Sequence, residues 1–252
     1  MENINVLKRD GSKEGFNVTK VKKVLKWACS NIEDVDPDRV LMNSRLNIFD
    51  NITSGDIHQI LIDSAGSLID SDVNYSKVAA RLFVYKMRKE VWGGKNPPKL
   101  IHLLKKGVES GYYDASLLDN YSDSQINKMD EFIDHDRDFM FEYGGLVQLN
   151  EKYLVQNRKT GEVFETPQFA YILTAMTLAQ NEPIRKRLSF VKEFYGDFSL
   201  HKINLSTPIM AGARTRTKSY SSCCIIDVDD TKGSLFAANT SAGMVTCDKY
   251  GV

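Results

Sequence analysis

The chain has 252 residues, with 33 lysines and arginines against 33 aspartates and glutamates, so its formal net charge is zero. Hydrophobic residues make up 42% of it, which is enough for buried cores, and the length suggests about two domains. Nucleic-acid coats and membrane-surface proteins normally carry an excess of positive charge, so the neutral balance argues against both classes. A net charge of zero is still compatible with a local basic pocket that binds a nucleotide.

The sequence predicts neither a membrane span nor a secretory signal. No apolar run approaches the roughly 18 residues that a spanning helix needs, and residues 1–5 lack a basic region followed by an apolar stretch. The cysteines are few and scattered: Cys29, Cys223, Cys224 and Cys247. This usage is typical of a reduced, cytoplasmic protein rather than of a disulfide scaffold.

The first ninety residues predict a hairpin followed by four helices. Asp10-Gly11 separates two short extended pieces within residues 4–16, and both residues tolerate positive φ. Thr19 can cap a helix whose apolar positions recur at helical spacing from Val21 to Ala28. Three further helices are expected over residues 37–49, from a Ser54 cap onward, and from about Ser76 to Val91.

Glycines and prolines between Gly93 and Pro98 end the fourth helix and predict a domain boundary. Residues 99–205 have a mostly helical pattern, interrupted by one hairpin over residues 153–165. Pro167 suits the first turn of a helix, and Pro183 suits the start of another. A second, mainly helical domain is therefore expected.

Residues 221–228 are nearly continuous in apolar character, which predicts a buried strand. A turn then leads to a short helix from Leu235 to Met244. A buried strand needs partners on both sides, and no other long β segment is present to provide them. We therefore expect residues 206–252 not to fold without a partner, since an unpaired apolar strand is prone to aggregation.

Several separated motifs, taken in order, resemble one family. They are Lys8-Arg9-Asp10-Gly11 with Glu14 and Lys20; Asp56-Ile57-His58; Ala79-Ala80-Arg81; the run from Phe132 to Asp138; Lys152-Tyr153-Leu154-Val155; and Thr207-Pro208-Ile209-Met210 leading to Ser221-Ser222-Cys223. With these motifs the N-terminal region resembles the ATP-cone module. The whole chain resembles the large (α) subunit of class I ribonucleotide reductase.

The resemblance implies a mainly α fold in three parts. Residues 1–95 would form an ATP cone of four helices with an N-terminal β-hairpin, and residues 96–205 the helical N-terminal domain. Residues 206–252 would begin the ten-stranded α/β barrel with its first strand. The family's large subunits are several-fold longer, so the expectation is a split gene, as where mobile elements interrupt such genes in phages, or a truncated form of one long chain.

One constellation predicts a nucleotide site. A triphosphate needs cations near its phosphates and a small slot for adenine, and a basic hairpin beside a helix start can supply both. Spacing alone favours a solvated basic face, whereas the resemblance implies an activity site for ATP or dATP. The matching residues are Val6, Lys8, Arg9, Glu14, Asn17, Lys20, Val21, Ser54 and His58. Ser54 stands where relatives often have Thr, and Glu90 where some have a basic residue, which leaves open whether dATP inhibits.

Cys223 and Cys224 would point to opposite faces of a strand, so one of them at most could face a barrel interior. From the residues alone, two small buried side chains in a core strand explain the pair. The resemblance implies that Cys223 is one of two redox-active thiols that reduce the 2′ position of the substrate and form a disulfide. Its partner cysteine is absent from these residues, and Cys224 would serve packing.

The resemblance also implies parts of two further sites. Three residues match substrate-binding positions: Thr207, Ser222 and Gly251. Three match positions near an allosteric specificity effector: Asp230, Cys247 and Lys249. Without the resemblance, Thr207 and Asp230 would be read as ordinary turn residues.

Two other groups favour structural roles. The run from Asp134 to Asp138 suits ion pairing better than coordination, so no metal is expected in this chain. Cys29, beside Ala28 on the first helix, is expected to pack in a core.

The function implied is that of the N-terminal part of a ribonucleoside-diphosphate reductase large subunit, which reduces ribonucleotides to deoxyribonucleotides by radical chemistry. The implied partners are a C-terminal large-subunit polypeptide, a small β subunit that holds the radical cofactor, a second α subunit, thioredoxin or glutaredoxin, and a ribonucleoside diphosphate substrate. ATP, dATP and other nucleoside triphosphates would be allosteric effectors. The alternative, from a different class, is a free-standing ATP- or dATP-sensing module without catalysis.

Overall fold

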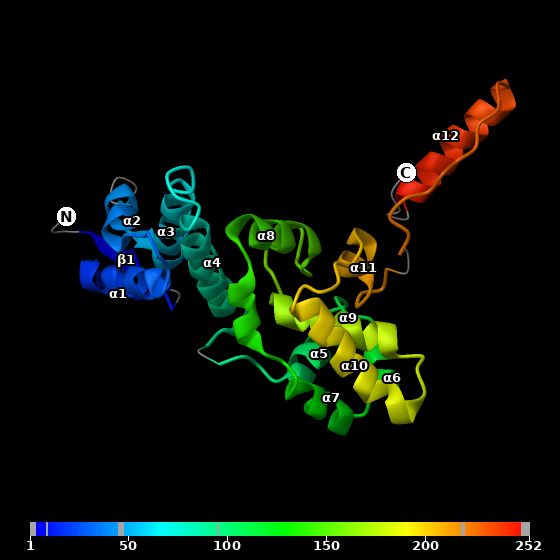
Figure 1. The fold of residues 1–252 in the computed structure, drawn as a ribbon, viewed down its shortest axis with the longest axis horizontal. Helices are drawn as coiled ribbons and strands as arrows, with labels where there is room; N and C mark the ends of the chain where they lie inside the picture. Colours follow the sequence, from blue (N-terminus) through cyan, green and yellow to red (C-terminus); the bar gives the residue numbers. More distant parts are fainter. Residues whose placement is uncertain (1–3, 9, 45–47, 95, 218–219, 248–252) are drawn as a thin grey trace. The chain divides into compact units, whose positions relative to one another are not determined.

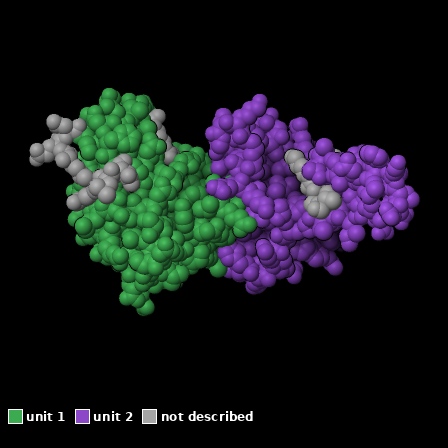
Figure 2. Space-filling view, turned by 90° about the horizontal axis from the view of Figure 1, so that it is seen from above, with its two compact units in different colours: residues 1–97, 136–150 green, residues 98–135, 151–252 purple. Residues whose placement is uncertain are grey.

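The computed structural model describes residues 4–8, 10–44, 48–94, 96–217 and 220–247 (Figure 1). This part of the chain is mainly helical, which confirms the predicted fold class. It forms two compact units, coloured separately in Figure 2: a first unit of residues 1–97 with 136–150, and a second unit of residues 98–135 with 151–252. In these described ranges no helix combines the length and apolar character that crossing a bilayer requires.

The first unit begins with a small sheet. β1 (Asn5–Leu7) pairs antiparallel with β2 (Lys13–Gly15) and parallel with β3 (Ile52–Thr53). Gly11 has a φ of 81° in the turn between β1 and β2, a conformation that costs glycine little. The predicted hairpin is therefore confirmed. The sequence does not predict β3, because a strand of two residues is too short to show an alternating pattern.

Four helices follow the hairpin, as the sequence predicts. They are α1 (Val18–Cys29), α2 (Pro37–Ser44), α3 (Ser54–Gly66) and α4 (Tyr75–Trp92). The predicted caps are wrong by one or two positions. Asn17 caps α1, because its side chain accepts from the backbone N–H of Thr19, and Thr53 caps α3 by accepting from the N–H of Asp56. Both capping residues have the extended backbone that lets a side-chain oxygen reach back to the first turn.

The core of the first unit lies among these four helices and the sheet. Its fully buried members include Leu25, Val40, Ile62 and Leu82. Cys29 packs in the same core, as expected, and burial raises the pKa of its thiol to about 11. At neutral pH this thiol stays protonated, so it behaves as a packing residue.

A segment that follows in the sequence also packs in the first unit. It contains most of η2 (His135–Met140), which is a 3₁₀ helix, and α8 (Tyr143–Gln148). Asp138 is fully buried, and its Oδ2 lies 3.2 Å from a guanidinium nitrogen of Arg88 on α4. Arg88 also lies 3.4 Å from Asp136, so the predicted ion pairing of this acidic run is confirmed. The predicted domain limits at residues 95 and 205 stay predictions.

The second unit is built from further helices. They are α5 (Leu100–Glu109), α6 (Ser116–Asn120), α7 (Asp123–Asp130), η3 (Leu149–Tyr153, which starts in the first unit), α9 (Pro167–Ala179), α10 (Ile184–Ser199) and α11 (Thr207–Gly212). α9 is the central helix, since nearly all of its residues are buried. Pro167 occupies its first turn and Pro183 immediately precedes α10, as predicted. The predicted hairpin over residues 153–165 is present as a single antiparallel bridge between Gln156 and Val163.

A buried ion pair lies in the second unit. Glu165 and Arg214 are both fully buried, and the guanidinium of Arg214 donates to the Glu165 carboxylate and to the carbonyl of Tyr153. Tyr113 donates its hydroxyl to the same carboxylate at 3.0 Å. Burial, and then the neighbouring Glu165 charge, raise the pKa of Tyr113 well above its ordinary value, so this phenol remains a donor. Together these bonds tie the segment after α11 to the strand-like segment before α9.

The predicted strand over residues 221–228 is wrong for the described chain. No residue of this segment pairs with another strand there, and Ile225 is 94% exposed. The apolar pattern indicates burial, but a strand forms only when neighbouring strands satisfy its N–H and C=O groups. The following helix, α12 (Lys232–Cys247), is longer than predicted and has no buried residue. We still predict that residues 206–252 need a partner in order to fold.

Candidate functional site

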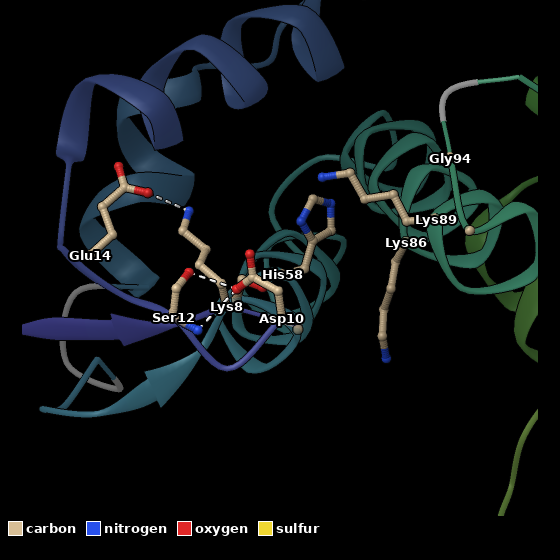
Figure 3. Close-up of a pocket in the computed structure, with 11 residues that line it drawn as sticks. Lys8, Asp10, Ser12, Glu14, His58, Lys86, Lys89 and Gly94 are labelled. Atoms are coloured by element: carbon tan, nitrogen blue, oxygen red, sulfur yellow. Dashed lines mark hydrogen bonds and ion pairs between the residues drawn. The ribbon is translucent and has the colours of Figure 1, made fainter.

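Two cavities in the first unit share part of their lining and lie against the N-terminal sheet. The larger is open, has a volume of about 680 Å³ and is lined mainly by charged and polar residues (Figure 3). Those residues are Lys8, Asp10, Ser12, Glu14, Ser54, Gly55, His58, Lys86, Lys89, Gly93 and Gly94. The smaller has a volume of about 140 Å³ and an apolar wall made of Val6, Phe16, Val21, Val24, Ile57 and Leu61.

The predicted nucleotide residues meet at the smaller cavity. Every one of them that the structure describes lines it: Val6, Lys8, Glu14, Asn17, Lys20, Val21, Ser54 and His58. Arg9 lies outside the described residues. The fold explains the convergence, because β1 and β2 lie side by side, β2 leads into α1, and β3 leads directly into α3.

Glu14 organises the cations of the hairpin. Its carboxylate lies 2.7 Å from the ammonium of Lys8 and also binds the ammonium of Lys20 at the start of α1. These hydrogen bonds, first that of Lys20 and then that of Lys8, lower the pKa of Glu14 to about 2. The carboxylate is therefore ionised at neutral pH and holds two lysines that line the apolar slot.

The turn of the hairpin is closed by its own side chains. Asp10 accepts hydrogen bonds from the backbone N–H and the hydroxyl of Ser12, at 2.9 and 2.6 Å. These bonds lower the pKa of Asp10. The turn thus keeps a defined shape at the edge of the larger cavity.

The opposite wall comes from α3 and α4. The first turn of α3 presents Ser54 and Gly55 to the larger cavity, and a helix N-terminus favours negative charge. One turn further on, the His58 ring stacks on Tyr85 of α4, with centroids 5.1 Å apart and an interplanar angle of 26°. A cavity with an apolar slot, oriented lysines and a helix N-terminus is chemically suited to a nucleotide with several phosphates.

Some lining residues are not predicted from the sequence. The apolar members Phe16, Val24, Ile57 and Leu61 have the spacing of ordinary core residues. Lys86 and Lys89 are a turn apart near the end of α4, and this spacing is the one signal that could have grouped them. Their membership depends on tertiary packing, because the cavity brings the end of α4 together with hairpin residues that lie far earlier in the sequence.

The structure does not assemble the other predicted site residues in the same way. Thr207 starts α11, is exposed, and its hydroxyl lies 3.2 Å from that of Tyr153. Ser222, Cys223, Asp230 and Cys247 are exposed, while Lys249 and Gly251 lie outside the described residues. Among the described residues, no three His, Cys, Asp or Glu side chains are grouped so that they could hold a metal ion.

Two models of known protein domains match parts of this chain. The model of the ATP cone domain matches residues 4–90, which include most of the cavity lining. The model of the ribonucleotide reductase all-alpha domain matches residues 139–218. The chain thus matches an ATP cone domain followed along the sequence by the all-alpha domain of ribonucleotide reductase.

Curated relatives point to one enzyme. The chain is 42% identical over 252 residues to ribonucleoside-diphosphate reductase 1 subunit alpha of Escherichia coli (strain K12), and covers 33% of that protein. It is 40% identical over 242 residues, 96% of its length, to the ribonucleoside-diphosphate reductase subunit alpha of Enterobacteria phage T4, of which it covers 32%. The chain spans about a third of the length of these relatives. It is a homologue of the N-terminal region of ribonucleoside-diphosphate reductase alpha subunits, which confirms the resemblance.

Proposed function

We propose that the paired cavities of the first unit bind ATP or dATP as an allosteric effector. The observation that carries the proposal is the convergence of eight predicted residues on an apolar slot that shares part of its lining with a cavity lined by lysines. The slot is suited to adenine, and the larger cavity to the phosphates. The ATP cone match over residues 4–90 supports the same assignment.

Each part of the site has a defined task in this proposal. Val6 and Val21 contribute to the apolar surface against which the base packs. Lys8 and Lys20, oriented by Glu14, place positive charge between the slot and the larger cavity. The first turn of α3 adds backbone N–H groups and the Ser54 hydroxyl as donors to phosphate oxygens.

Calorimetric titration of the full chain with ATP tests the proposal. We expect measurable binding, weakened about tenfold by Lys8→Gln, since the loss of one charged contact of about 1.4 kcal/mol changes a dissociation constant by that factor. Lys202→Gln is the matched control, because Lys202 pairs with Asp197 in the second unit, which contributes none of the described lining residues of either cavity. Absence of binding at millimolar ATP would overturn the proposal.

We further propose that the chain acts as the N-terminal part of a ribonucleoside-diphosphate reductase large subunit in the cytoplasm. Identity to proteins of that name along its whole length supports this. In the complete enzyme Cys223 would be one redox-active thiol, and it would form the disulfide with a partner thiol from the length of the relatives that this chain does not cover. Thr207, Ser222 and Gly251 would contact a ribonucleoside diphosphate, and Asp230, Cys247 and Lys249 a specificity effector.

The proposed partners follow from the same homology. They are a polypeptide that supplies the remaining length of the relatives, a second α subunit, a small β subunit that holds the radical cofactor, and thioredoxin or glutaredoxin. Co-expression with that polypeptide and a small subunit should restore ribonucleotide reduction, and Cys223→Ser should abolish it while Cys224→Ser should not. A stable chain that binds ATP but ignores the added polypeptide would support a sensing module instead.

A further inference from the structure

The end of α4 brings two lysines to the cavities that the sequence does not mark. Lys86 lines the larger cavity, whereas Lys89 lines both the larger and the smaller one. Gly93 and Gly94, just beyond the helix, complete the lining on this side and present no side chain to it. In Figure 3 this wall lies across the view from Lys8 of the hairpin.

The ammonium groups of the two lysines have different neighbours. The ammonium of Lys86 donates to the side-chain oxygen of Gln59 at 2.8 Å and lies 3.9 Å from the carboxylate of Glu90. These oxygens solvate and partly offset its positive charge. In Figure 3 the Lys86 side chain extends downward in the view, whereas Lys89 extends toward the side where His58 lies.

An aromatic ring positions Lys89. Its ammonium lies 4.1 Å from the centre of the Tyr85 ring, one helical turn earlier on α4. Such a contact with a π face orients a cation without neutralising it. The Tyr85 ring is itself held by the His58 ring, 5.1 Å away, and by the Trp27 ring, 5.6 Å away. Lys89 is therefore presented to both cavities by a fixed support.

We infer that Lys89 binds the terminal phosphates of the nucleotide and that Tyr85 is its positioning residue. This inference rests on the proposed nucleotide site and names its ligand class, a nucleoside triphosphate in preference to a monophosphate. Glu90, the next residue on α4, has its carboxylate 3.9 Å from the ammonium of Lys86.

Calorimetric titrations of the full chain with ATP, ADP and AMP test this inference. We expect Lys89→Gln to weaken ATP binding about tenfold and AMP binding by less than about twofold, because a lost contact to the terminal phosphates affects only ligands that have them. Lys86→Gln, which removes the same charge from the same helix, should weaken ATP binding by less than about threefold. Tyr85→Leu should weaken ATP binding nearly as much as Lys89→Gln does. Tyr85→Phe should bind ATP with the wild-type affinity, because the aromatic ring alone is enough to position the ammonium.

The outcomes separate the inference from the site itself. If the wild-type chain does not bind ATP, the proposed nucleotide site fails. If the wild type binds and Lys89→Gln binds ATP equally well, the site stands and the inference is overturned. Equal losses for Lys86→Gln and Lys89→Gln, or equal losses for ATP and AMP, would also overturn it, since they indicate a general charge effect or a disturbed fold. If Tyr85→Leu does not fold, the comparison of ATP affinity between Lys89→Gln and Lys86→Gln still tests whether Lys89 binds the terminal phosphates.

Discussion

Replacing Arg214 by methionine should destabilise the second unit strongly. The guanidinium of Arg214 donates to the Glu165 carboxylate and to the carbonyls of Met210 and Tyr153, and its side chain is fully buried. Methionine fills much of the volume but leaves the buried carboxylate without its counter-charge. Removing one partner of a buried pair costs about 3–5 kcal/mol of unfolding free energy.

Urea denaturation can isolate this effect. With a slope of about 2 kcal/mol per molar urea, a loss of 3–5 kcal/mol lowers the unfolding midpoint by about 1.5–2.5 M. Both tryptophans of the chain, Trp27 and Trp92, lie in the first unit, so their fluorescence follows that unit, whereas circular dichroism follows the helices of both. We expect Arg214→Met to shift a large part of the circular dichroism transition and to shift the fluorescence transition less.

Two further variants control the reasoning. Lys202→Met removes an exposed ion pair with Asp197 and should cost less than about 1 kcal/mol. Adding Glu165→Gln to Arg214→Met removes the uncompensated charge and should recover part of the stability. An Arg214→Met chain that unfolds at the wild-type urea concentration would refute the reasoning, as would a double variant that is less stable than the single one.

Three more predictions follow from single contacts. Gly107→Ala should cost about 1–3 kcal/mol of unfolding free energy by urea denaturation, since its Cβ would lie 2.1 Å from a ring carbon of buried Tyr113; wild-type stability would contradict this. Asp138→Ala should cost about 3 kcal/mol by tryptophan fluorescence, because Arg88 loses a fully buried partner, and an unchanged midpoint would count against it. The pKa of Glu14 is lowered to about 2, so its stabilising bonds are complete above about pH 4.5 and are lost toward pH 2. The gap in thermal midpoint between wild type and Glu14→Gln should therefore close on acidification over that range, and a constant gap would argue against the hairpin ion pairs.

The sequence predicts the elements that local signals define. Asp10-Gly11 specifies the hairpin turn, and the helical spacing from Val21 to Ala28 specifies the first helix. The helix starts are wrong by one or two residues because Thr19 and Ser54 are acceptable caps by type. Which residue caps depends on backbone angles that only the folded chain sets, and these favour Asn17 and Thr53.

Features that depend on distant contacts are not predicted. The pairing of Asp138 with Arg88 joins residues 50 apart and draws residues 136–150 into the first unit, which no local pattern indicates. The apolar run at 221–228 predicts a buried strand, but no partner strand lies in the described chain and the segment is mostly exposed there. Lys89 is an ordinary surface lysine by sequence, and its place at the cavities arises from the tertiary packing of α4.

Hydrogen–deuterium exchange of the full chain with and without ATP tests the central claim most directly, because it locates the nucleotide. If the cavities of the first unit bind ATP, amides of residues 5–8, 13–21, 52–61 and 85–92 should exchange more slowly with the nucleotide present, since these segments contain most of the lining residues. Residues 100–130 and 167–199 should be unchanged. Protection confined to the second unit, or bound ATP without protection of the hairpin and the first turns of α3, would contradict the assignment.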